Sequence, residues 1–181
     1  MKANFENKKI LLTGASGGIG KALSEKFIIN GAKLIFTSSN NNKLNELKSL
    51  YGEDHSYHLL DLSKKENLMD NVKNITENNK DIDILINNAG ITKDNLLLRM
   101  SIEQWQEVID TNLSASFYII KNVLPNMVKN RKGKILGITS VVALTGNPGQ
   151  SNYTASKGGM ISMYKSLAQE VAQRNININV I

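Results

Sequence analysis

The sequence predicts an α/β fold in which a parallel sheet is covered by helices on both faces. Short apolar runs alternate along the chain with longer amphipathic stretches, the pattern of repeated strand–helix units. Four of the runs are followed by polar or glycine-rich segments, and parallel sheets of this kind bind ligands beyond the carboxyl ends of their strands. No linker, repeat or low-complexity segment interrupts the pattern. We therefore expect a single doubly wound domain over residues 1–181, with three layers (α/β/α) and six strands.

The expected strands are the apolar runs themselves, each bounded by turn residues. They lie at residues 9–14, 33–38, 57–62, 82–90, 133–140 and 175–181. The last run, "NININVI", alternates polar and apolar residues as a strand does.

The expected helices lie between these strands and carry recognisable start and stop signals. The first helix runs to about Asn30 and ends before Gly31, because glycine readily adopts the left-handed conformation that closes a helix. Leu44, Leu47 and Leu50 mark one face of the second helix. A long helix is expected over residues 112–130, and another begins within residues 151–159.

Two capping boxes, each a serine followed three residues later by Glu or Gln, predict further helix starts. Ser63 and Glu66 begin a helix that continues toward Asn79. Ser101 and Gln104 begin the helix that carries Trp105.

Composition excludes several classes of protein. With 41% hydrophobic and 21% charged residues, the chain is typical of globular proteins, and the absence of cysteine excludes disulfides and thiolate chemistry. The only histidines, His55 and His58, are expected at the surface, and no metal site is expected. The N-terminal apolar run is too short for a signal peptide, and no stretch is long enough to span a membrane, so a cytoplasmic location is expected. The net charge of +6 comes from scattered lysines, which favours a solvated surface over a nucleic-acid face.

A glycine-rich turn, "TGASGGIG" at residues 13–20, connects the first strand to the first helix. Glycine allows close approach of a pyrophosphate, and the following helix N-terminus favours anions. The alternative is a tight turn without a ligand, but the strand before and the helix after favour a dinucleotide site. A P-loop is excluded, because Ala15 stands where its first glycine is required and Ala22 replaces its Mg²⁺-binding hydroxyl.

Tyr153 and Lys157 are four residues apart in "SNYTASKGG" and would share one face of a helix. A neighbouring ammonium favours the phenolate and lowers the pKa of a tyrosine, which suits a catalytic proton donor. Because the chain has many lysines and five tyrosines, such a pair also arises by chance, and other residues must decide.

The chain resembles the short-chain dehydrogenase/reductase family over essentially its whole length. The resemblance rests on Thr13-Gly14-x-x-x-Gly18-x-Gly20, Asp61, Asn87-Asn88-Ala89-Gly90, Asn112, Ser140 and Tyr153-x-x-x-Lys157, in that order. Within the family, "NAGITKDNLLLRM" and "TSVVALTGNPGQSNY" resemble the ketoreductases of bacterial fatty-acid synthesis. The resemblance implies a Rossmann-type fold and an NADP-dependent oxidoreductase that reduces 3-oxoacyl groups carried by acyl carrier protein.

The same resemblance implies a role for each of four catalytic residues. Tyr153 would donate a proton to the substrate carbonyl oxygen, and Ser140 would orient that oxygen by a hydrogen bond. Lys157 would lower the pKa of Tyr153 and hold the nicotinamide ribose, and Asn112 would hold water that resupplies the proton. Packing, solvation and turn formation are the alternative roles for these residues.

Cofactor contacts are implied for the glycine turn, the ends of three strands and the catalytic pair. The residues are Gly14, Ser16, Gly17, Gly18, Ile19, Gly20, Ser38, Ser39, Asp61, Leu62, Asn88, Ala89, Gly90, Tyr153 and Lys157. Asn87 is expected to support the strand end instead.

The preferred cofactor follows from the end of the second strand. No acid stands there to grip a ribose 2′-hydroxyl; Thr37, Ser38 and Ser39 are neutral, which favours NADP(H) over NAD(H). Gly17 replaces the arginine that many NADP(H)-using relatives carry, and Lys43 would supply a cation only if its helix points it inward.

Arg131 and Arg174 match the positions at which the family places arginines that dock the acidic carrier protein, and helix capping is the alternative.

Because the chain ends at Ile181, the family's seventh strand and substrate lid are missing, and the sixth strand is expected at an exposed edge. A fragment or truncated form of a longer enzyme is therefore expected, with a homodimer built from the retained helices and a tetramer if a full-length chain exists. Two other functions stay open: a related dehydrogenase for another ketone or alcohol, and a cofactor-binding remnant without turnover.

Overall fold

The computed structural model describes residues 4–181 and contains one six-stranded sheet. The strands are β1 (Lys9–Leu12), β2 (Lys33–Ser38), β3 (Ser56–Leu59), β4 (Ile84–Asn87), β5 (Gly133–Gly137) and β6 (Ile176–Val180). All adjacent pairs are parallel, in the order β3-β2-β1-β4-β5-β6. The chain reverses its direction across the sheet between β1 and β4, where a doubly wound fold opens its ligand crevice. The predicted fold class and the edge position of the sixth strand are confirmed.

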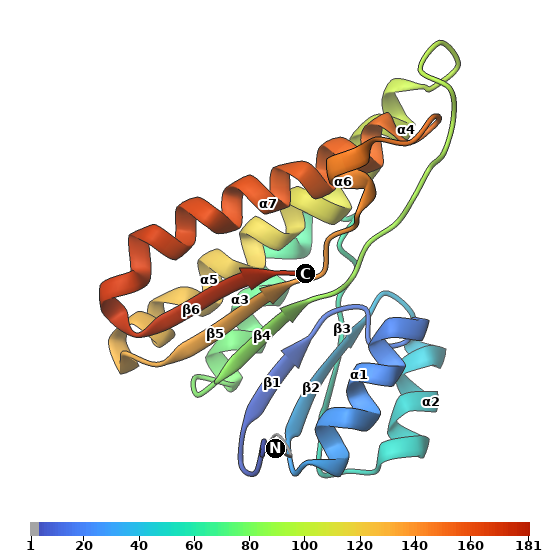
Figure 1. The fold of residues 1–181 in the computed structure, drawn as a ribbon. Helices are drawn as coiled ribbons and strands as arrows, with labels where there is room; N and C mark the ends of the chain where they lie inside the picture. The colour runs from blue at the N-terminus through green and yellow to red at the C-terminus, as the bar shows by residue number, and fades with distance from the viewer. Residues whose placement is uncertain (1–3) are drawn as a thin grey trace.

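Helices cover the sheet on both faces, as Figure 1 shows. They are α1 (Gly18–Ile29), α2 (Asn41–Tyr51), α3 (Lys65–Asn78), α4 (Ile102–Ile109), α5 (Ala115–Asn130), α6 (Val142–Thr145) and α7 (Ser151–Val171), with a π-helical turn, η1 (Asp110–Ser114), and a 3₁₀ turn, η2 (Ala172–Arg174). No helix within residues 4–181 combines the length and apolar character needed to cross a membrane.

Alternation along the strands sends successive side chains to opposite faces, which produces two apolar cores. Ile10 and Phe36 point toward α1 and α2 and join one core. Leu11, Ile35 and Leu85 point toward α3, α5 and α7 and join the other. The sheet therefore rests on fully buried side chains from both layers, and its carboxyl edge is left to carry polar groups.

The structure corrects one of the two capping boxes. Ser101 accepts a hydrogen bond from Gln104 N at 3.2 Å, and Gln104 Oε1 accepts one from Ser101 N at 3.0 Å, as predicted. The Ser63 hydroxyl instead donates to Asp61 Oδ1 at 2.7 Å, and α3 begins at Lys65 without a side-chain cap. Ser63 does not cap α3, because its hydroxyl is hydrogen-bonded to the neighbouring carboxylate of Asp61 instead.

Three further expectations meet a mixed outcome. Gly31 follows the end of α1 with φ of 87°, as predicted. The long helix begins with the π-helical turn η1 and becomes α-helical at Ala115. His55 and His58 are half-buried rather than at the surface, and burial lowers the pKa of each. His55 Nδ1 accepts from Leu34 N at 3.3 Å, and the His55 ring packs edge-on against Phe36, which accounts for its partial burial.

Candidate active site

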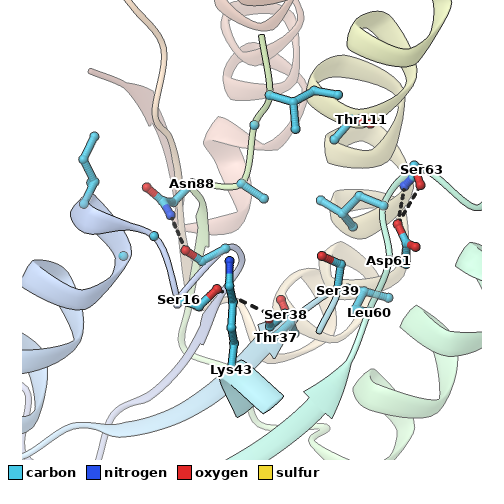
Figure 2. A pocket seen from close by; sticks show the side chains of 18 of the residues that line it. Ser16, Thr37, Ser38, Ser39, Lys43, Leu60, Asp61, Ser63, Asn88 and Thr111 are labelled. Atoms are coloured by element: carbon cyan, nitrogen blue, oxygen red, sulfur yellow. Dashed lines mark hydrogen bonds between the residues drawn. The ribbon is translucent and has the colours of Figure 1, made fainter. Parts of the chain in front are cut away.

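A cavity of about 620 Å³ opens beyond the carboxyl ends of β1, β2 and β4. This volume falls within the range typical of small-molecule sites. Figure 2 shows its wall, which combines the glycine turn, the end of β2, the segment after β3 and the segment after β4. The predicted cofactor residues before Tyr153, from Gly14 to Gly90, all line it. The catalytic candidates lie outside this lining set.

Two positions of the glycine turn require the absence of a side chain. Gly14 has φ of +64°, and a Cβ there would lie 2.8 Å from Ala89 Cα. A Cβ on Gly20 would overlap the Gly14 carbonyl oxygen. Gly18 has no such neighbour within 4 Å. The turn therefore forms a concave cradle at the N-terminus of α1, where free N–H groups and the helix dipole favour a phosphate.

Asn88 ties this turn to the end of β4. Its Nδ2 donates to the carbonyl oxygens of Thr13 at 2.9 Å and Gly14 at 3.1 Å. The Thr13 hydroxyl accepts from the N–H groups of Asn88 and Ala89, both at 3.0 Å. These bonds fix the spacing of two segments that are 75 residues apart in the chain.

The end of β2 carries hydroxyl groups and one inward-pointing cation. The Ser16 and Ser38 hydroxyls are 3.3 Å apart, and Ser39 also lines the cavity. Lys43 follows the N-cap Asn40 of α2 and extends its ammonium into the cavity near Ser16 (Figure 2). The geometric condition set for Lys43 is therefore met, and no carboxylate lines this end of the cavity.

Asp61 carries the carboxylate at the opposite end of the cavity. Partial burial raises its pKa, but two hydrogen bonds from Ser63 and the ammonium of Lys64 outweigh that effect and hold the pKa below its ordinary value. Asp61 is therefore ionised at neutral pH and can accept hydrogen bonds from a ligand.

Lys157 is the most deeply buried cation of the site, with 3% of its surface exposed. Its Nζ donates to Ile138 O at 2.8 Å and lies 5.7 Å from the centre of the Tyr153 ring. Burial lowers the pKa of Lys157 to about 8. A Cβ on Gly90 would lie 3.3 Å from this Nζ, so Lys157 stands directly behind the cavity wall.

Asn112 lies beside Lys157 in the π-helical turn η1 and is 1% exposed. Its Oδ1 accepts from Ile91 N at 2.8 Å, and its Nδ2 donates to Ile91 O at 3.0 Å and Ser156 Oγ at 3.1 Å. These contacts join η1, the segment after β4, and α7 at one point.

Tyr153 and Ser140 complete the predicted group. Tyr153 lies in the first turn of α7, one turn before Lys157. Ser140 comes two residues after Ile138, the carbonyl partner of Lys157, and its Oγ accepts from Val142 N at 3.4 Å. The Lys157 ammonium lies near the Tyr153 ring. Its bond to Ile138 O ties it to the segment that carries Ser140, and the bond between Asn112 and Ser156 ties η1 to α7 one residue before Lys157.

Asn87 has the supporting role expected for it. Its Nδ2 donates to Tyr164 OH at 2.8 Å and Ser116 Oγ at 3.0 Å, and those hydroxyls are 2.9 Å apart. This buried triangle holds β4 against α5 and α7 beneath the site.

Arg131 comes shortly before β5 and Arg174 shortly before β6, so both lie at the amino edge of the sheet, opposite the cavity. Arg131 ends α5 in a left-handed conformation, and its guanidinium donates to Gln173 O at 2.8 Å. The capping role that was the alternative is therefore observed for Arg131, and docking stays a prediction.

Sequence reasoning assigned no cofactor contact to several residues that line the cavity. They are Thr37, Leu60, Ser63, Ile91, Glu107 and Thr111, whereas Lys43 was assigned a contact on the condition that its helix points it inward. Leu60 and Ser63 could have been found as neighbours of Asp61. Glu107 lies in α4 and Thr111 in η1. No sequence motif predicts that these two elements line the same cavity as the glycine turn.

The whole arrangement is that of a nucleotide-sized cavity with a phosphate cradle and, behind it, a buried lysine facing a phenol. The short chain dehydrogenase model matches residues 8–181. The chain belongs to this family, and hence to the oxidoreductases.

Among relatives, 3-oxoacyl-[acyl-carrier-protein] reductase FabG of Escherichia coli K12 is 44% identical over 178 residues, covering 98% of this chain and 73% of the relative. The reductase of the same name from Salmonella typhimurium is 43% identical over the same shares. A solved structure described as a short chain dehydrogenase/reductase family protein superimposes with a TM-score of 0.91 at 26% identity, over 98% of this chain and 74% of that one. The chain spans about three quarters of the length of these relatives.

Proposed function

We propose that this protein reduces 3-oxoacyl groups, carried by acyl carrier protein, to 3-hydroxyacyl groups with NADPH. The observation that carries the proposal is the buried Lys157 ammonium, 5.7 Å from the Tyr153 ring and directly behind Gly90 of the cavity wall. Similarity to reductases named for this substrate supports the substrate class.

The residues present fit a dinucleotide. The cradle at Gly14 and Gly20 would hold the pyrophosphate, the ionised Asp61 would accept from the adenine, and Asn88 to Gly90 would line the ribose. When bound, the nicotinamide supplies a hydride to the carbonyl carbon of the substrate. Ser16, Ser38 and the inward ammonium of Lys43 would bind a 2′-phosphate, which supports NADPH over NADH.

Tyr153 would protonate the carbonyl oxygen from its hydroxyl, and Ser140 would hold that oxygen by a hydrogen bond. Lys157 would stabilise the phenolate left behind, because an ammonium in a water-poor site attracts the developing charge strongly. Asn112 would hold the water from which Tyr153 regains its proton.

The test is NADPH oxidation by the purified chain with acetoacetyl-carrier protein, with cofactor binding followed separately by fluorescence. Tyr153→Phe should lower kcat by about 10²- to 10⁴-fold while NADPH still binds, because the proton donor is lost and the phosphate cradle is untouched. Turnover of other ketones alone would favour a different substrate, and cofactor binding without turnover would favour a remnant. A strong preference for NADH in kcat/KM would refute the cofactor assignment. The carrier-docking arginines, the homo-oligomer and the cytoplasmic location stay predictions.

A further inference from the structure

Asn152, the residue immediately before Tyr153, has no exposed surface and a saturated side chain. Its Nδ2 donates to Lys93 O at 3.0 Å and Gln104 O at 3.3 Å, and its Oδ1 accepts from Tyr153 N at 2.7 Å. The orientation of the amide is unambiguous, because a flip would place Oδ1 against two carbonyl oxygens. A fully buried amide with three backbone partners is held tightly in one position.

The three partners of Asn152 belong to different segments. Lys93 lies in the β4–α4 loop (residues 88–101), Gln104 lies in α4, and Tyr153 lies in α7. Two further bonds join the same loop to the start of α7: Asn95 N donates to Gly149 O, and Gln150 Nε2 donates to Asp94 Oδ2, both at 2.8 Å. The Gln150–Asp94 bond is exposed, so water can replace it, whereas the Asn152 side chain has no exposed surface at which water could bind it.

The backbone of Tyr153 is clamped on both sides by buried side chains. Asn152 accepts from its N–H, one of the groups in a first helical turn that lack an intrahelical partner. Ser156, also without exposed surface, donates to the Tyr153 carbonyl oxygen at 2.7 Å and accepts from Asn112. Within residues 4–181, two neighbouring side chains form hydrogen bonds with the Tyr153 backbone, and no side chain forms one with the Tyr153 hydroxyl. The clamp therefore fixes the backbone from which the phenol projects.

We propose that Asn152 is a positioning residue, which holds the turn that carries Tyr153 in register with the β4–α4 loop and α4. The inference rests on the proposed function for the role of Tyr153, but the placement of the phenol can be measured without turnover. A displacement of about 1 Å at a reacting group can cost about 10²-fold in rate.

Asn152→Asp separates positioning from bulk stability, because it keeps the size of the side chain and an acceptor for Tyr153 N. An ionised carboxylate would face the carbonyl oxygens of Lys93 and Gln104, which repel it, and burial would raise its pKa. Once protonated, the carboxyl donates to one of those oxygens again. The defect should therefore be large at high pH and repaired in part as the pH falls.

The direct measurement is NMR of the protein with ¹³C at the ring Cζ of its five tyrosines, with the Tyr153 signal assigned by its loss in Tyr153→Phe. In Asn152→Asp, the Tyr153 signal should be displaced at high pH and return toward its wild-type position as the pH falls. Where the chain turns over, kcat should be about 10- to 100-fold lower at high pH and recover in step with the signal. KM for NADPH should stay within about twofold, because the cradle is untouched.

Other titrating groups on the three segments are common to all variants and can be subtracted. They are Lys93, Asp94, Arg99, Glu103, Glu107, Tyr153, Lys157, Tyr164, Lys165 and Glu170. Asn147→Asp serves as the matched control, because Asn147 is exposed and lies on the same approach to α7, and its side chain bonds only Gln150 Oε1 among residues 4–181, at 2.9 Å. It introduces the same charge and should leave the Tyr153 signal unchanged.

Asn152→Ala, which adds no charge, covers the case in which Asn152→Asp does not fold. It should displace the Tyr153 signal at every pH, without recovery in acid. The proposal is overturned if either folded variant only lowers the melting temperature while the Tyr153 signal and the pH profile of kcat match the wild type. A displaced signal in a chain that reduces no carrier-linked substrate would uphold the positioning role and refute the proposed function instead.

Discussion

The two faces of the sheet are packed with different kinds of side chain. The core beneath α1 and α2 is aromatic and aliphatic, with Phe36 stacked between Tyr51 and Tyr57 at centroid distances of 5.6 and 5.1 Å. The core beneath α3, α5 and α7 is mostly aliphatic, with Tyr164 as its buried aromatic residue, and it adjoins buried amides and the Lys157 ammonium near the carboxyl edge. Buried polar groups of this kind require specific partners, whereas an apolar core requires only volume.

The difference matters because the two faces support different parts of the site. On the first face, the cavity owes its shape to missing side chains at Gly14 and Gly20 and to backbone groups. On the second, Lys157, Asn112, Ser156 and Asn152 are placed by hydrogen bonds between side chains and backbone. Substitutions should therefore act through sterics on one side and through hydrogen bonding and charge on the other.

The largest effect is expected from Gly20→Ala, on the steric side. The new Cβ would overlap the Gly14 carbonyl oxygen and force the cradle open, at a cost of about 3 kcal/mol in the free energy of unfolding. NADPH affinity should fall about 100-fold, measured by fluorescence titration. Gly158→Ala in α7 meets no atom closer than 3.9 Å and should instead stabilise the protein by about 0.5–1 kcal/mol. Equal effects of the two substitutions would contradict a steric origin.

The next effect concerns the buried charge on the other face. Lys157 releases its proton at about pH 8 when folded and at about 10.5 when unfolded, so between these values the unfolded state holds more protons and stability rises with pH. The gain should approach about 3 kcal/mol across that range and be absent in Lys157→Met. Denaturation by urea at several pH values measures it. Parallel stability–pH curves for the two proteins would show that the buried ammonium costs nothing.

The smallest effect compares two serines that share a sequence pattern. Ser101→Ala removes an observed helix cap and should cost about 1 kcal/mol. Ser63→Ala should change stability by less than about 0.5 kcal/mol, because Ser63 caps no helix. It should instead raise the pKa of Asp61 toward its ordinary value, because the hydroxyl hydrogen bond to the carboxylate is lost while the backbone N–H of residue 63 still donates, and NMR titration would detect the change. A larger loss of stability from Ser63→Ala would restore the predicted capping box.

Local patterns in the sequence sufficed to predict most of the fold and part of the candidate site. The six strands and their helices follow from apolar periodicity, which is a property of neighbouring residues along the chain. The glycine cradle and the Tyr153–Lys157 pair were likewise predicted, because their chemistry lies within eight residues or fewer. The partial burial of the histidines and the absence of a Ser63 cap were not predicted, because burial and the choice of hydrogen-bond partner depend on which groups lie nearby in space.

The sequence by itself determined the fold class, the position of the phosphate cradle and the pairing of a phenol with a cation. Only the tertiary structure decided that Lys43 points into the cavity, that Arg131 caps a helix away from it, and that Asn152 joins α7 to the β4–α4 loop. The physical reason is that burial and hydrogen-bond partners arise between segments up to 77 residues apart, whose approach no local pattern encodes.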